Sequence, residues 1–158
     1  MRLYQILESR IDNKNGAGAV PDNQEVDYFG KKVAMTPRMF LKLAKPLQFD
    51  KDVEKTILGL MDYMKQGNKI GSPFFGIKLP GEWFDGNFDT QEKPRVMNHE
   101  GRHRMYALQS MDGNNPVEVH LFFRGGVRAR DITPEIMAKL NEGILNEEGR
   151  YVSGPLFN

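Results

Sequence analysis

The chain has no cysteine, no long apolar segment and almost no net charge, and each of these absences excludes a class of function. Without cysteine among 158 residues there is no disulfide, thiol nucleophile or thiolate metal site, which fits a reducing compartment. No apolar run approaches the roughly 20 residues that cross a bilayer, and residues 1–5 do not open a signal peptide. We therefore expect a cytoplasmic protein without a membrane partner.

The charge balance limits how the protein can attract an anionic partner. Lys and Arg total 22 and Asp and Glu total 21, so the net charge at pH 7 is +1. A chain of this kind has no global field to draw it onto nucleic acid. Hydrophobic residues make up 39% of the chain and charged residues 27%, which is typical of a globular protein with one core. Any anion binding must therefore come from a local cluster of side chains.

Helix-start signals occur at three places and predict three helices. Thr36 before Pro37 and Thr133 before Pro134 each combine an N-cap with a proline at the first helical position. Asp50 opens a longer helix with an apolar stripe that ends at Gly67. The last helix is predicted to carry apolar residues up to 144 and to be closed at 149.

Strand-like segments lie between these helices, and together they predict an α/β (α+β) fold, a small mixed sheet with flanking helices. Residues 26–35 favour two short strands around a turn at Gly30, and further strands are expected at 74–79, 95–97 and 117–123. A helix is predicted from 101 to 111. We expect residues 1–25 to be an arm or loop, 26–150 one domain and 151–158 a loose tail.

One segment concentrates chemically active side chains at a predicted strand-to-helix junction. Around Gly101 lie one carboxylate, two histidines and two arginines. The first turn of a helix offers unpaired N–H groups and a positive dipole end, and glycine lets a ligand approach the backbone. Arg102 and Arg104 suit phosphate oxygens, and His103 can donate a hydrogen bond or relay a proton. The alternative is a solvated helix start whose arginines pair with nearby acids.

Residues 100–107, Glu-Gly-Arg-His-Arg-Met-Tyr-Ala, resemble the Gly-x-x-Arg-x-x-Ala signature of the ParB/sulfiredoxin superfamily. The order of predicted elements from about residue 33 to 123 resembles that superfamily as well. The resemblance implies a ParB/sulfiredoxin-like fold and a nucleotide site for ATP or CTP with Mg²⁺. It implies that Gly101, His103 and Arg104 contact phosphates and that Glu100 is the family's acidic residue before the glycine.

Two departures from the superfamily narrow the expected function. Sulfiredoxin has a catalytic cysteine after the glycine, where this chain has Arg102, so reduction of sulfinic acids is excluded. Partition proteins carry a DNA-binding domain after this one, and 35 residues follow Phe123 here, which disfavours centromere binding. We expect a stand-alone module of the phage or mobile-element type, acting in the host cytoplasm if encoded by a phage.

Two functional hypotheses follow from this motif. In the first, the protein is an NTP-dependent phosphotransferase, NTPase or nuclease that uses a divalent cation, with Glu100 and His103 as catalytic residues and Gly101, Arg102, His103 and Arg104 binding phosphate. In the second, the protein is a non-catalytic module whose same pocket binds a nucleotide or a nucleic acid.

A competing interpretation takes residues 99–103 as the H-E-x-x-H signature of zinc hydrolases. That chemistry needs His99 and His103 one turn apart on one helix face. A glycine inside the motif costs about 1 kcal/mol of helix propensity, which disfavours a helix through His99. His120 or Glu118 could complete a zinc site, but the alternating pattern around His120 predicts a surface or half-buried side chain.

Further polar residues are candidate contacts for substrate or nucleic acid, namely Thr36, Arg38, Lys78, Arg128 and Arg130. For each of them a simpler role is available, as a helix cap or a solvated charge. The loop at 80–90 holds the single tryptophan, Trp83, and is expected either to fold over the core or to act as a lid.

Overall fold

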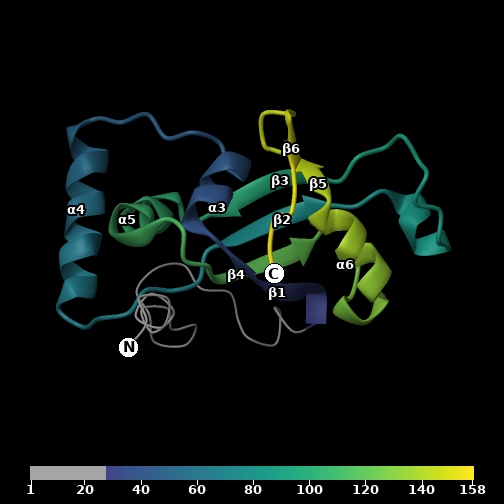
Figure 1. Ribbon diagram of the computed structural model, residues 1–158, viewed down its shortest axis with the longest axis horizontal. Coiled ribbons are helices and arrows are strands. Elements are labelled where there is room, and N and C mark those ends of the chain that lie inside the picture. The colour runs from purple at the N-terminus through teal and green to yellow at the C-terminus, as the bar shows by residue number, and fades with distance from the viewer. Residues whose placement is uncertain (1–27) are drawn as a thin grey trace.

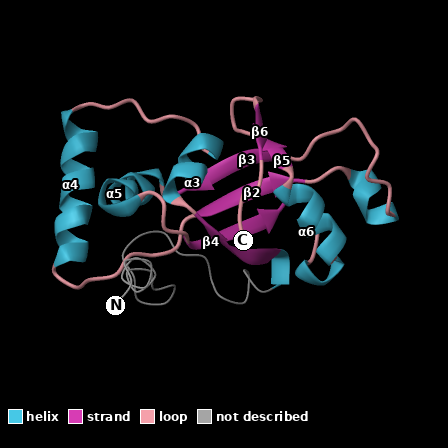
Figure 2. Cartoon of the chain, in the orientation of Figure 1, coloured by secondary structure: helices cyan, strands magenta, loops and turns pink. Residues whose placement is uncertain are grey.

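A curled six-stranded mixed sheet runs through the middle of the structure, a computed structural model that describes residues 28–158 (Figures 1 and 2). The predicted α+β class with a small mixed sheet and flanking helices is confirmed. The arm predicted for residues 1–25 lies outside the described residues. The strand order is β1-β4-β2-β3-β5-β6. The strands are β1 (Gly30–Met35), β2 (Phe74–Lys78), β3 (Arg95–Glu100), β4 (Val117–Phe123), β5 (Gly143–Leu145) and β6 (Tyr151–Ser153).

Three predicted helix starts are confirmed by side-chain caps. Thr36 accepts the Met39 N–H at 3.1 Å to open α3 (Pro37–Leu43), and Thr133 accepts the Ile136 N–H at 3.2 Å to open α6 (Pro134–Asn141). Asp50 accepts the Val53 N–H at 2.8 Å at the start of α4 (Lys51–Lys65). Helix α5 (Arg102–Asp112) contacts both α3 and α4, and these helices gather near one end of the sheet, whereas α6 lies near the other (Figure 1).

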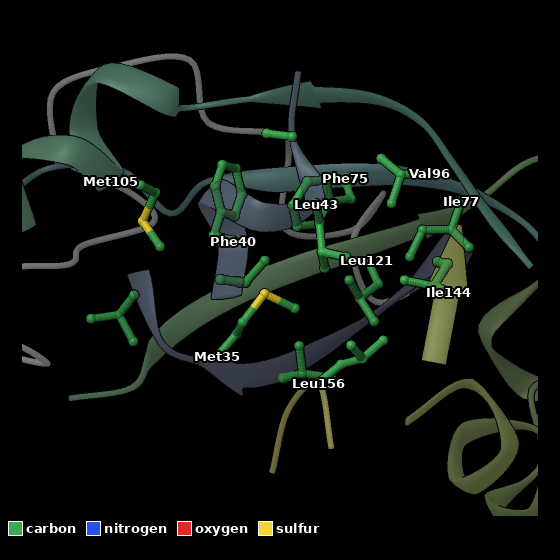
Figure 3. Packing of buried hydrophobic residues seen from close by; sticks show 14 of the residues in the cluster. Met35, Phe40, Leu43, Phe75, Ile77, Val96, Met105, Leu121, Ile144 and Leu156 are labelled. Atoms are coloured by element: carbon green, nitrogen blue, oxygen red, sulfur yellow. The ribbon is translucent and has the colours of Figure 1, made fainter. Parts of the chain in front are cut away.

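The core lies between the inner face of the sheet and the helices. Phe40 of α3 stacks on Phe75 of β2 with ring centroids 4.3 Å apart, and both rings are fully buried. Figure 3 shows Met105, Leu121 and Ile144 in the same cluster. Trp83 is buried in that cluster too, so the aromatic loop at 80–90 packs on the core as the first of its two interpretations expected.

A register shift in the middle of the sheet decides which side chains of β3 face the core. Gly76 lies opposite Asn98 but Ile77 lies opposite Val96, so Met97 is an extra residue in the ladder. Beyond it, His99 pairs with the buried Phe75 and Glu100 pairs with Phe74. Because paired residues share a face, His99 is on the core side and Glu100 on the outer side.

Two of the predicted boundaries were wrong. Tyr28 and Phe29 are helical and a single strand begins at Gly30, where a turn between two strands was predicted. The last helix ends at Asn141, and Ile144 belongs to β5 and not to that helix. The physical reason is tertiary pairing, because β5 pairs with β3 on one side and with β6 on the other.

The prediction of a loose tail at 151–158 is also overturned. Tyr151–Ser153 form the edge strand β6, and Leu156 is buried in the core (Figure 3). The Asn158 N–H donates to the carbonyl of Ala34 at 2.9 Å, so the last residue binds the opposite edge strand β1. A segment this short carries little local signal for a strand, and its order comes from the residues it pairs with and packs on.

Among residues 28–158, no helix is both long and apolar enough to cross a membrane.

Leu156→Ala tests whether the C-terminal segment is part of the core. Leu156 is 4% exposed, and truncating a buried leucine typically costs about 2–5 kcal/mol in free energy of unfolding. The matched control is Leu58→Ala on the outer side of α4, where the side chain is 53% exposed and a change within about 0.5 kcal/mol is expected. Urea unfolding followed by circular dichroism measures both, and equal stabilities would contradict the packing of this segment.

Candidate functional site

The junction between β3 and α5 is built on the backbone of Gly101. This residue has φ +113° and ψ 20°, a left-handed conformation that side chains with a Cβ rarely adopt. A Cβ on Gly101 would lie 2.7 Å from the Cβ of Pro73, so the residue also fits a narrow space. The prediction that Gly101 opens a helix at the end of a strand is confirmed.

A cavity of about 310 Å³ lies at this junction and is lined by six consecutive residues, 99–104. Gly101 provides no side-chain cap for α5. Across the described chain, no hydrogen-bond partner is found for the amide N–H groups of Arg102, His103 and Arg104. Unpaired amides and the positive end of the helix dipole favour an anion at this position.

Arg104 is held by the protein itself. Its side chain is 5% exposed, its Nη1 donates to the carbonyl of Gly71 at 2.8 Å, and its Nη2 donates to Glu100 Oε1 at 3.3 Å. Burial lowers the pKa of Arg104 from its usual value, and the charge of Glu100 opposes that shift. Both terminal nitrogens therefore make hydrogen bonds within the protein, and the bond to Gly71 connects α5 to the loop before β2.

Arg102 is engaged as well, whereas His103 is not. Arg102 Nη1 donates to the carbonyls of Lys45 and Pro46 at 2.9 and 3.1 Å, which fixes the loop after α3 against α5. His103 lies on the first turn, is half-buried, and has no hydrogen bond to any other described residue. Of the three side chains at this helix start, His103 is thus the one available to a ligand.

Sequence reasoning missed a carboxylate that meets the motif from elsewhere in the chain. Glu147 Oε1 lies 2.5 Å from Nδ1 of His99, and the two side chains are only 11% and 15% exposed. Glu147 is in the turn between β5 and β6, 48 positions after His99. The sequence placed Glu147 just before the predicted close of the last helix at Gly149, which gave no reason to connect it with the motif.

The geometry that the zinc interpretation needs is not met. His99 lies in β3, His103 lies in α5, and the left-handed Gly101 between them breaks any continuous helix. The two imidazoles are therefore not one turn apart on a single helix face. Within 28–158, no group of three His, Asp or Glu side chains comes together as metal ligands.

His120 is fully buried, so the prediction of a surface or half-buried side chain was wrong. Strand β4 is an interior strand between β1 and β2, so His120 has the side chains of Lys32 and Phe74 beside it on the same face of the sheet. His120 Nε2 is 3.5 Å from Glu118 Oε2, and neither ring nitrogen makes a hydrogen bond. His120 does not line the cavity at Gly101.

The other predicted contacts are not brought into the cavity. Thr36 caps α3, and Arg38 is exposed on that helix. Lys78 is exposed at the end of β2 away from the cavity, where the loop after β4 also begins (Figure 1). In that loop the Arg128 guanidinium carbon lies 5.3 Å from the centre of the Tyr28 ring, and Arg130 lines an open groove of about 610 Å³.

Comparisons of the chain with protein-family models, with curated proteins and with solved structures found no match. The candidate site is therefore defined by its own geometry. It consists of a glycine-started helix, a cavity, one available histidine and a histidine–carboxylate pair.

Substituting Gly101 tests the constraint at the junction. Gly101→Ala is expected to lower the free energy of unfolding by about 1–3 kcal/mol because the backbone conformation is strained for alanine, and the contact with Pro73 adds to this. Gly59→Ala in α4 is the control, since nothing lies within 4 Å of its added Cβ and alanine should stabilise the helix by roughly 0.5–1 kcal/mol. Denaturant titrations should show that the free energy of unfolding falls for Gly101→Ala and rises for Gly59→Ala. A change of the same sign in both variants would refute the constraint at Gly101.

Arg104→Ala tests the structural role of this buried arginine. Removal leaves the buried Gly71 carbonyl without its donor, which typically costs about 1–3 kcal/mol. Arg130→Ala removes an exposed arginine and should change stability by no more than about 0.5 kcal/mol. Melting temperatures of the two variants without any ligand distinguish the roles, and an unchanged value for Arg104→Ala would exclude the tie to Gly71.

Proposed function

We propose that the cavity at Gly101 binds the phosphate groups of a nucleoside triphosphate and that the protein transfers or hydrolyses a phosphate. The observation that carries this proposal is the set of three unpaired amides at the start of α5, beside a cavity with an available histidine. Backbone amides at a helix start bind phosphate in many unrelated proteins, and here no side chain caps them.

The size of the cavity supports the same ligand class. A volume of about 310 Å³ is at the small end of ligand pockets, which suits a phosphate chain with the rest of the nucleotide extending outward. The resemblance of residues 100–107 to the ParB/sulfiredoxin superfamily adds ATP and CTP as the first nucleotides to test.

The proposed roles of the side chains follow from their contacts. His103 donates a hydrogen bond to a phosphate and stabilises charge that develops there. Glu100 accepts a hydrogen bond from Arg104 and is one of the residues that line the cavity. Mg²⁺ is usually held by the substrate's phosphates and one or two carboxylates, not by an all-protein cage, so in this proposal the ion arrives with the nucleotide.

A non-catalytic nucleotide-binding module is the second candidate. The contacts of the two arginines favour it. Arg102 and Arg104 already donate to backbone carbonyls, and Arg104 donates to Glu100 as well, so these N–H groups are not free to stabilise charge that develops in a reaction. The exposed arginines at the far end of the sheet would then offer a separate contact to nucleic acid. Formation of nucleoside diphosphate distinguishes the two candidates. Either function belongs in the cytoplasm, and in the host cytoplasm if a phage encodes the protein.

His103→Ala tests the proposed phosphate site. Loss of a hydrogen bond to a charged acceptor typically costs about 1.5–3 kcal/mol, or roughly 10- to 150-fold in affinity. The measurement is calorimetry with ATP, CTP and GTP in the presence of Mg²⁺, after thermal-shift screening selects the nucleotide that stabilises the folded protein most.

Arg130→Ala serves as the control for that experiment, because Arg130 lies in the groove after β4 and outside the cavity. Its affinity for nucleotide should equal that of the parent. If the parent binds none of the three nucleotides at millimolar concentration, or if His103→Ala binds as tightly as the parent, the phosphate site is refuted.

A further inference from the structure

His99 is the only side chain of the cavity that is paired with a carboxylate from a distant part of the described chain. Its Nδ1 lies 2.5 Å from Glu147 Oε1, while the other lining residues with ionisable contacts pair locally or with backbone carbonyls. A histidine oriented by a carboxylate is the arrangement that general bases use in many enzymes. The pair therefore calls for an explanation beyond phosphate binding.

The carboxylate of Glu147 is fixed before any ligand binds. Its Oε2 accepts the Lys45 N–H at 2.9 Å, and the Glu147 N–H donates to the Leu43 carbonyl at 3.1 Å. The side chain of Asn146 holds the turn itself, since its Oδ1 accepts the amides of Glu148 and Arg150 at 3.0 and 2.9 Å. The end of α3 and the β5–β6 turn therefore hold the carboxylate in place.

This arrangement also fixes which nitrogen of His99 can accept a proton. An ionised carboxylate only accepts hydrogen bonds, so Nδ1 must carry the hydrogen that points at Glu147. In neutral His99 the lone pair then lies on Nε2. No described residue hydrogen-bonds to Nε2, and His99 lines the cavity. The Nε2 lone pair is thus not taken up by a hydrogen bond to another described residue.

We propose that His99 is a general base that takes a proton from a hydroxyl group, either of water or of an alcohol, and that Glu147 is its positioning residue. This inference rests on the proposed function. The hydroxyl proton moves to His99 Nε2 and the hydroxyl oxygen forms a bond to the terminal phosphorus. The bond from that phosphorus to the bridging oxygen breaks, and the nucleoside diphosphate leaves with the electron pair.

The base determines the class of acceptor. A carboxylate acceptor carries no proton at neutral pH and would need no base, whereas a hydroxyl must lose its proton as it attacks. Glu100 and His103 lie on the same cavity, but His99 alone has a partner that fixes its tautomer. A hydroxyl acceptor is therefore the substrate class that this pair of side chains serves.

The first test reads the tautomer of His99 directly, without nucleotide. The chain has three histidines, so ¹⁵N–¹H correlation spectra of the imidazoles in untagged, full-length protein are simple to assign with His99→Gln. We expect His99 to be protonated on Nδ1 when neutral, and Glu147→Ala to convert it to a mixture of tautomers. Glu148→Ala, which removes the exposed neighbouring carboxylate, should leave the spectrum unchanged. A neutral His99 protonated on Nε2 would overturn the proposal.

The second test separates this inference from the proposed function by measuring binding and turnover in the same proteins. Calorimetry with ATP, CTP and GTP gives affinity, and nucleoside diphosphate formation with Mg²⁺ gives turnover, with water, glycerol or serine as hydroxyl acceptor. His99→Gln should bind nucleotide within about threefold of the parent but lose roughly 10²- to 10⁴-fold in turnover. Glu147→Ala should lose at least about tenfold, and Glu148→Ala nothing.

The outcomes are distinct. If the parent binds none of the nucleotides, the proposed function fails and this inference fails with it. If the parent binds nucleotide but forms no diphosphate with any of the three acceptors, or if His99→Gln turns over like the parent, the general base is refuted while the phosphate site stands. Melting temperatures of every variant exclude unfolding as the cause of a loss.

Discussion

The close contact between Gly101 and Pro73 is the constraint on which the candidate site depends. It turns the chain from β3 into α5 within one residue, and only a glycine has both the left-handed backbone and the room. That turn exposes the first amides of α5 and directs Arg104 back to Gly71, in the loop that holds Pro73. The same local geometry therefore leaves the first amides of α5 unpaired and anchors the loop before β2 to that helix.

A second region, the chain between α3 and α4, connects the site to the C-terminal strands. Arg102 binds the carbonyls of Lys45 and Pro46, and Glu147 accepts the Lys45 amide from the other side. Asn146 Nδ2 adds a hydrogen bond to the Lys42 carbonyl at 3.3 Å. Three segments far apart in the sequence thus meet at the end of α3, and each supplies polar groups that the others need.

The sequence predicted those parts of the molecule whose signals are local. Thr36, Asp50 and Thr133 each cap a helix through an atom three residues away, and Gly101 starts α5 where a strand pattern stops. Alternating residues at 117–123 likewise identified β4.

Features that depend on distant partners could not be predicted in this way. Glu147 meets His99 only because the sheet brings β5 beside β3, and the short strands β5 and β6 have too few residues to show a period. The alternation along β4 predicts an accessible position for His120, yet it is fully buried in an interior strand, beside residues of β1 and β2 that are distant in the sequence. The sequence predicted Arg104 as a phosphate contact and gave no sign of its hydrogen bond to the Gly71 carbonyl, because that acceptor lies 33 residues earlier and has no side-chain signature.

The extra residue in β3, Met97, has a consequence for how the motif is read along the strand. In an uninterrupted ladder the side chains alternate strictly, so the phase set by the buried Val96 would put His99 on the outer face and Glu100 on the core face. The bulge shifts that phase by one, so that the imidazole and not the carboxylate reaches Glu147. Which side chain of the motif meets Glu147 thus depends on the bulge at Met97. One extra residue in β3 exchanges the faces on which His99 and Glu100 lie, although neither residue changes.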